Sequence, residues 1–296
     1  MNTLEIPGRN VKISIPARYD EMTSAQVIYI MERLAEHRAG IISLDEFRVK
    51  ILYKLCGIRR TLRSVIWAAW HPESPAQRYQ RAEQTALLCD QLLGGILEKS
   101  GADYQIKFDS VRNFWPTVRI GWRRLVGPAE ALLDLSFAEF RDATDEMQLY
   151  LKTKDERHLD RMLACLYRPA GPLQPSGRHV VPYSADTLDK YAGLCHRFKP
   201  WQKQLVLLWF SACVKYMQTD RFIIGSQEIC FAELFKSDTN TSDTKPSLGW
   251  MTILYDLAEK RIFGDAEKTE QQGMIEILSL LYHYKRRNDA TARKNR

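Results

Sequence analysis

Helix start signals, each followed by apolar residues at helical spacing, recur along this chain of 296 residues. Ser43–Glu46 and Ser136–Glu139 are capping boxes, in which the first and last side chains can each accept a backbone N–H of the first helical turn. Ser74–Pro75 is another start signal, because proline fits the first turn of a helix. The sequence therefore predicts a mainly α, multi-helix globular protein.

The predicted helices cover most of the chain. Their approximate ranges are residues 24–38, 44–57, 75–99, 137–151, 156–166, 185–196, 201–217, 248–261 and, from a further capping box at Thr269–Gln272, 269–284. The helix at 201–217 is the most apolar, so we expect it at the centre of a helical core. Residues 58–70 mix arginine with tryptophan, valine and isoleucine, which predicts a basic amphipathic helix with either a solvated arginine face or a surface for phosphate or an acidic partner.

Two segments predict strands. Val11–Ile15 alternates apolar with polar residues and is followed by Pro16, which indicates a short N-terminal strand. Residues 104–124 alternate aromatic and aliphatic residues with polar ones, which predicts a small β-hairpin insert.

The predicted hairpin insert carries a candidate contact surface in which arginines alternate with tryptophans. The candidate residues are Arg112, Trp115, Arg119, Trp122, Arg123 and Arg124. This composition is typical of a stacking platform for single-stranded nucleic acid, and equally of a protein interface. A half-buried hairpin with no binding role gives the same pattern, so all three interpretations stay open.

The positive charge of the chain is concentrated at one end. The net charge is +7, and residues 285–296 hold six basic residues and one acidic residue, which is +5 and leaves +2 for the rest. We expect this basic tail to be frayed. Its residues Lys285, Arg286 and Arg287 are further candidate contacts for nucleic acid or a partner.

Residues 170–182 are rich in proline and glycine, which makes them the best linker candidate. A linker there would separate an N-terminal helical region with the β insert, residues 1–169, from a C-terminal helical region, residues 183–284, with the basic tail at 285–296. A single domain is the alternative at this length.

Sequence motifs for catalysis or cofactor binding are absent. The chain has no glycine-rich phosphate loop and no nucleophile elbow. Its six histidines are isolated from one another and its six cysteines form no C-x-x-C pair. We therefore expect no catalytic residues, no cofactor and no metal site. The sequence also has no secretory-signal pattern and no uninterrupted apolar run of 18 residues, so we expect no export and no membrane contact.

Short aromatic and turn signatures occur at several places from the middle of the chain onward. They are Leu125–Pro128, Leu135–Phe140, Tyr150–Asp155, Leu163–Pro169, Lys199–Gln202, Leu207–Phe210 and Ile262–Asp265. Over residues 105–290 the chain resembles uncharacterised tail-region proteins of tailed bacteriophages and prophages. The resemblance implies a role in virion or tail morphogenesis, as an assembly factor or minor structural protein, with other tail proteins as partners and a location in the host cytoplasm or the virion. It supplies no established functional residues.

Three functional hypotheses follow. The first is a non-enzymatic macromolecule-binding protein of phage or prophage assembly, whose oligomeric state the sequence leaves open. The second is a nucleic-acid-associated factor that uses the basic and aromatic residues and the basic tail. The third is an enzyme whose site is assembled from residues distant in the sequence.

Overall fold

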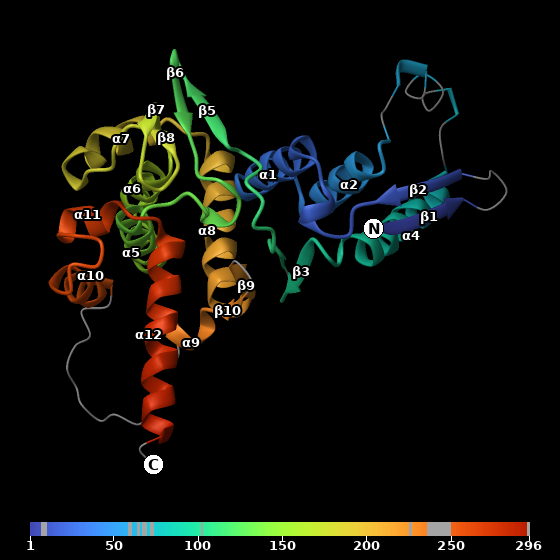
Figure 1. Cartoon of the computed structure of the whole chain (residues 1–296). Coiled ribbons are helices and arrows are strands. Elements are labelled where there is room, and N and C mark those ends of the chain that lie inside the picture. The colour runs from blue at the N-terminus through green and yellow to red at the C-terminus, as the bar shows by residue number, and fades with distance from the viewer. Residues whose placement is uncertain are drawn as a thin grey trace. The chain divides into compact units, whose positions relative to one another are not determined.

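The computed structural model describes residues 1–6, 11–58, 61–63, 66, 70–71, 74–101, 103–224, 227–235 and 250–294. They form two compact units: unit 1 comprises Met1–Ser110 and Pro200–Leu205, and unit 2 comprises Val111–Lys199 and Val206–Arg296. Helices dominate, and the strands form small antiparallel sheets (Figure 1). This confirms the prediction of a mainly α protein with a minor β component.

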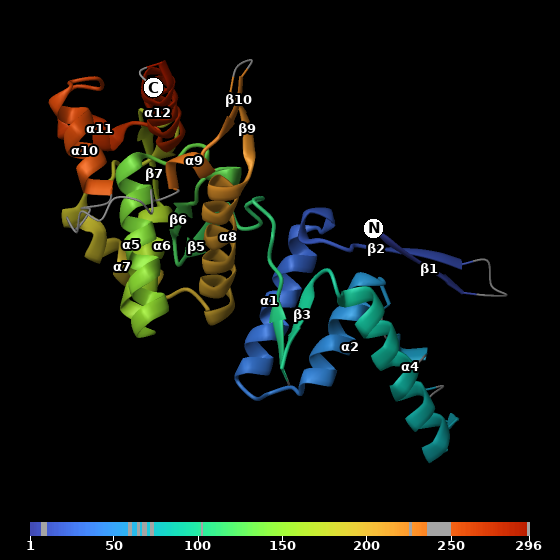
Figure 2. The same cartoon turned by 90° about the horizontal axis from the view of Figure 1, so that it is seen from below.

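Unit 1 places its helices beside two hairpins (Figure 2). Its described elements are β1 (Asn2–Ile6), β2 (Val11–Ile15), η1 (Tyr19–Glu21), α1 (Ser24–Arg38), α2 (Leu44–Leu55), α4 (Pro75–Leu93), β3 (Leu97–Ser100) and β4 (Asp103–Ile106). β1 pairs with β2, and β3 pairs with β4. The side chains of Thr23, Ser43 and Ser74 accept backbone N–H groups at the starts of α1, α2 and α4, so these three predicted helix starts are confirmed.

The core of unit 1 includes the apolar faces along which α1 and α2 pack together, and the buried end of β2. Its fully or almost fully buried side chains include Ile15, Val27, Ile30, Met31, Phe47 and Ile51. Burying a side chain of this size stabilises the fold by about 1.5–3 kcal/mol. The predicted N-terminal strand is therefore confirmed as β2, whose Ile15 lies in this core.

Unit 2 contains a four-stranded sheet and most of the remaining helices. Its described elements are β5 (Thr117–Ile120), β6 (Arg123–Val126), η2 (Glu130–Leu132), α5 (Phe137–Thr153), α6 (Glu156–Leu166), β7 (Arg168–Leu173), β8 (His179–Val180), η3 (Ala185–Thr187), α7 (Leu188–Cys195), α8 (Pro200–Thr219, in unit 2 from Val206), β9 (Arg221–Ile224), β10 (Gln227–Cys230), α9 (Ala232–Phe235), α10 (Trp250–Glu259), α11 (Ala266–Gln271) and α12 (Met274–Lys294). The sheet order is β5-β6-β7-β8.

The core of unit 2 lies between α5, α6 and α8. The rings of Phe140 on α5 and Phe210 on α8 are 6.2 Å apart between centroids, and both are buried. The Ser211 hydroxyl of α8 lies 3.3 Å from the Met147 sulfur of α5. The most apolar predicted helix is thus a core helix, as expected.

The predicted linker at residues 170–182 is wrong. β7 and β8 are part of the sheet of unit 2, and the boundary between the units lies at Ser110 and Val111. A Cβ on Gly171 would meet the backbone of Val181 at 2.5 Å, so this glycine serves close strand packing. The predicted division into residues 1–169 and 183–284 therefore does not match the two units.

The predicted hairpin insert at residues 104–124 belongs to two different hairpins. Its first residues lie in β4, which pairs with β3 in unit 1, and its last ones form β5 and the start of β6 in unit 2. The prediction correctly found extended structure but joined strands that pair with other neighbours.

Three predicted helix boundaries are also wrong. The helix expected to reach residue 99 ends at Leu93, and Gly95 then packs so closely on the Ala17 carbonyl that no Cβ fits. The helix expected to start at Thr269 is in fact two helices. Asp265 caps α11, and Thr269 is buried inside this helix. The second helix, α12, starts at Met274, whose backbone N–H donates to the Leu135 carbonyl. The tail expected to be frayed from residue 285 continues α12 as far as Lys294.

Two predictions fall partly outside the described residues. They are the basic amphipathic helix at 58–70, of which residues 59–60, 64–65 and 67–69 are not described, and the first two residues of the helix at 248–261. From Trp250 the second of these is present as α10.

Candidate functional site

The β5–β6 hairpin is closed by the two-residue turn Gly121–Trp122. Ile120 lies opposite Arg123, and Gly121 has a φ of 60°, a value that L side chains rarely adopt. Trp122 is not among the residues with positive φ. A positive φ followed by a negative one matches a type II′ turn, whose twist suits paired strands. The glycine therefore fixes the turn that places Trp122 at the hairpin tip.

The two faces of this hairpin differ in character. Val118, Ile120 and Leu125 are buried, whereas Arg119 and Arg124 are exposed and lie directly opposite each other in the register. In a two-residue hairpin this is the non-hydrogen-bonded pair, in which Cα atoms are about 4.5 Å apart. Like charges so placed destabilise the sheet. Within the described residues, neither guanidinium has an acidic partner, so the pair is open to an external anionic group.

Trp122 is the most exposed large hydrophobic side chain among the described residues, at 88%. It stands at the end of a hairpin that projects from the rest of unit 2 (Figure 1). The guanidinium of Arg123 lies 5.0 Å from the centre of its ring. A cation–π contact of this kind is worth about 0.5–1 kcal/mol at an exposed site, enough to favour one ring orientation. We call Arg119, Trp122, Arg123 and Arg124 the arginine–tryptophan tip.

The base of the hairpin is firmly anchored. The Tyr167 hydroxyl donates a hydrogen bond of 2.8 Å to the Trp115 carbonyl, and a Cβ on Gly127 would meet the Tyr167 ring at 2.6 Å. At the end of β6, Arg178 Nη2 donates to the Val126 carbonyl at 2.7 Å. The tip is therefore carried by a rigid support.

Two of the predicted contact residues lie outside the tip. Trp115 is partly buried and belongs to the support just described. Arg112 lies 3.8 Å from a Glu130 carboxylate oxygen and 5.3 Å from the centre of the Phe114 ring. The structure thus brings four of the six hairpin candidates together and gives the other two local partners.

The predicted contacts Lys285, Arg286 and Arg287 lie on α12, remote from the hairpin (Figure 1). Arg286 and Arg287 lie 5.7 and 5.5 Å from the ring centres of Tyr282 and Tyr284. They form a separate basic surface.

A groove of about 590 Å³ between α6 and α7 holds two histidine–carboxylate pairs that the sequence did not reveal. His158 Nδ1 lies 2.7 Å from Glu146 Oε2, and His196 Nδ1 lies 2.8 Å from Asp160 Oδ2. Asp160 is buried while His196 is 74% exposed. Such pairs can orient an imidazole and move a proton. Their members are 12 and 36 residues apart, so no sequence spacing could have found them.

The buried thiols are poor nucleophiles. Burial raises the pKa of Cys89 to about 11 and moves the pKa of Cys165 and Cys213 further above the ordinary range. Since the thiolate is the reactive form, these three cysteines have little reactivity near neutral pH.

Within the part of the chain that the structure describes, no cluster of three or more histidine, cysteine or acidic residues is arranged to hold a metal ion. No described helix is both long and apolar enough to cross a membrane. In comparisons with known proteins, no family model, curated protein or solved structure matched the chain.

Proposed function

We propose that this chain is a non-enzymatic binding protein that inserts its arginine–tryptophan tip into an acidic pocket of a protein partner. The observation that carries the proposal is Trp122, 88% exposed at the end of a rigidly supported hairpin and flanked by arginines without acidic partners among the described residues. Tryptophan and arginine are the residues that most often dominate the binding energy of protein interfaces.

The compactness of the tip favours a protein over a nucleic acid. β5 has four residues, which corresponds to about 13 Å of strand. A single ring and three guanidinium groups lie within that length. Single-stranded nucleic acid is usually held by several rings along a basic groove, and the second basic surface of this chain lies elsewhere, on α12. A single anchor flanked by charges fits one pocket in a protein.

The resemblance to phage tail-region proteins supplies the proposed setting. The partner would be another tail protein, and the chain would act in virion or tail morphogenesis, in the host cytoplasm or in the virion. A projecting anchor suits either an assembly factor or a minor structural component, because both recognise a defined site on a neighbour.

The proposal can be tested by placing a photo-reactive amino acid at position 122 in cells that produce the virion. We expect one partner protein to be cross-linked, and the product to disappear when Arg119→Glu and Arg124→Glu are added. The matched control carries the same photo-reactive group at Leu173, which is 62% exposed on β7 of the same sheet. Mass spectrometry of the product shows whether the partner is a tail protein.

Two results would contradict the proposal. One is equal cross-linking from positions 122 and 173, which would mark nonspecific contact. The other is tight binding of single-stranded DNA or RNA by fluorescence anisotropy at about 150 mM salt that Trp122→Ala abolishes, which would assign the tip to nucleic acid.

A further inference from the structure

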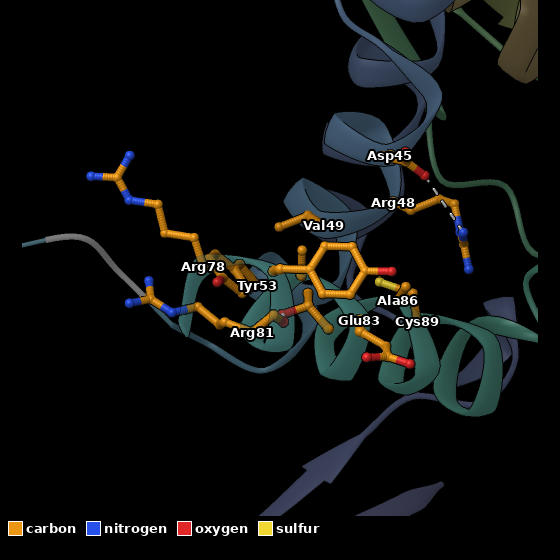
Figure 3. A pocket seen from close by; sticks show the side chains of 12 residues that line it. Asp45, Arg48, Val49, Tyr53, Arg78, Arg81, Glu83, Ala86 and Cys89 are labelled. Atoms are coloured by element: carbon orange, nitrogen blue, oxygen red, sulfur yellow. Dashed lines mark hydrogen bonds and ion pairs between the residues drawn. The ribbon is translucent and has the colours of Figure 1, made fainter. Parts of the chain in front are cut away.

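Unit 1 has an open groove of about 540 Å³ between α2 and α4 (Figure 3). Its apolar and aromatic lining consists of Val49, Tyr53, Tyr79, Ala82, Ala86 and Cys89. Figure 3 shows Tyr53 between the two helices, and Arg78 and Arg81 at the end of the groove away from Arg48. The groove therefore combines an apolar floor with a charged rim.

The α4 side of the groove carries a helix-packing stripe of which, among the described residues, one half is buried and the other half is exposed. Residues 79, 82, 86, 89 and 93 follow one another at alternating spacings of three and four, the pattern of a helix–helix seam. Cys89 and Leu93 are buried in unit 1, whereas Tyr79 is 75% exposed and both Ala82 and Ala86 are exposed. The stripe thus continues beyond its internal partner.

From Pro75 to Leu87 almost every side chain of α4 is exposed. Helices of about this length are only marginally stable in water unless one face packs against a partner. The exposed half of the stripe is therefore where a further helix would stabilise α4.

We propose that a second copy of this chain covers the groove, with the two α4 helices antiparallel around a two-fold axis at Ala82. In that arrangement residue 82+n lies opposite residue 82−n of the partner, as in any isologous contact. The small side chain of Ala82 at the axis allows the two backbones to approach closely. The proposal concerns unit 1 and is independent of the arginine–tryptophan tip in unit 2.

The side chains around the axis are self-complementary. Arg81 lies opposite Glu83 of the second copy, and the symmetry forms this pair of opposite charges twice. Tyr79 lies opposite Thr85 and next to Ala86, so its large ring meets small side chains. Both size and charge therefore match when α4 meets itself in this direction.

Sedimentation velocity of the full-length protein tests the association. We expect a monomer–dimer equilibrium that shifts with concentration between about 5 and about 500 µM, as mass action requires. Arg81→Glu and Glu83→Arg should each raise the dimer Kd by about tenfold or more, because each replaces two attractive pairs by two repulsive ones. The double variant should recover the original Kd. Gln84→Arg changes the charge on the far side of α4 and is the matched control.

Cysteine cross-linking tests the direction of the helices. Ala82→Cys should oxidise to a disulfide-linked dimer, whereas Thr85→Cys should do so only when mixed with Tyr79→Cys; the unmodified chain is the control for its own cysteines. A protein that stays monomeric at the highest concentration overturns the proposal, and so do charge variants that do not compensate or a Thr85→Cys chain that links to itself. Trp122→Ala should leave the dimer unchanged, so failure of this proposal is distinguishable from failure of the proposed function.

Discussion

Glu139 and Arg178 form an ion pair in the interior of unit 2, with 3.1 Å between Oε1 and Nη1 and side chains that are 1% and 2% exposed. Arg168 contacts the same carboxylate oxygen, while Oε2 accepts the Ser136 backbone N–H at 2.8 Å. Burial lowers the pKa of both arginines, and their mutual repulsion adds to the effect in Arg168. One carboxylate is therefore the counter-charge of two buried guanidinium groups. It also positions Arg178, which donates to the Val126 carbonyl at the end of β6.

Replacing this carboxylate should destabilise unit 2 strongly. Glu139→Gln keeps the shape of the side chain but leaves two guanidinium groups buried without a counter-charge, so we expect a loss of about 3–5 kcal/mol in the free energy of unfolding. Urea unfolding measures the loss. Glu130→Gln, at an exposed carboxylate near Arg112, is the control and should change stability by less than about 0.5 kcal/mol. Equal effects of the two substitutions would refute a special role for the buried pair.

Removing the repulsion between the two opposed arginines of the hairpin should instead increase the stability of the protein. Arg124→Glu converts a like-charged cross-strand pair with Arg119 into an attractive one, so stability should rise by about 0.2–1 kcal/mol. The midpoint of urea unfolding measures the change. Thr117→Glu, on the exposed face of β5 but opposite Val126, is the control for added negative charge alone. If Arg124→Glu destabilises the protein while its control does not, the arginines are not repelling each other.

Local signals in the sequence predicted local structure well. Ser43, Ser74 and Ser136 each cap a helix as expected, because a cap and its helix are set by residues three or four apart. The alternation in Val11–Ile15 likewise gave a strand. These features depend on few distant contacts.

Features that depend on distant contacts were mispredicted or missed. The proline and glycine content of residues 170–182 indicated a linker, yet Gly171 packs on the backbone near Val181 and Arg178 is paired with Glu139, 39 residues away. The histidine–carboxylate pairs were missed for the same reason. Among the six hairpin candidates, only the alternation of exposed and buried positions could have distinguished Arg119 from Trp115. Predicting that alternation requires knowing how β5 and β6 pair.

Asp155 should make α6 sensitive to acid. Its carboxylate accepts the Arg157 backbone N–H at 2.9 Å and contacts the Arg157 guanidinium at 2.7 Å, and hydrogen bonds from Arg157 lower the pKa of Asp155 from 3.8 to about 2. A pKa lower in the folded state than in the unfolded state means that the ionised group stabilises the fold above about pH 4. This contribution is lost as the pH falls through about 2.

The matched variant for this prediction is Asp155→Asn, which can still cap the helix but does not titrate. Between pH 4 and pH 2 the free energy of unfolding should fall more steeply for the natural protein than for the variant, as measured by urea unfolding at several pH values. Parallel curves over this range would show that the ion pair does not contribute to stability.

Removing residues 285–296 separates the two basic surfaces of the chain. The truncation takes away +5 of charge, and the described side chains of this segment are exposed or half-buried at the end of α12. We therefore expect the melting temperature to change little and cross-linking from position 122 to persist. If the chain bound nucleic acid through α12, the slope of log K against log salt would flatten on truncation, because fewer phosphates are neutralised. A variant with Lys285, Arg286 and Arg287 all replaced by glutamine keeps the helix and removes only charge, so it shows whether any effect comes from charge or from length. Loss of the cross-link in both variants would mean that the partner is bound through α12, contrary to the assignment of the contact surface to Trp122 and its neighbouring arginines.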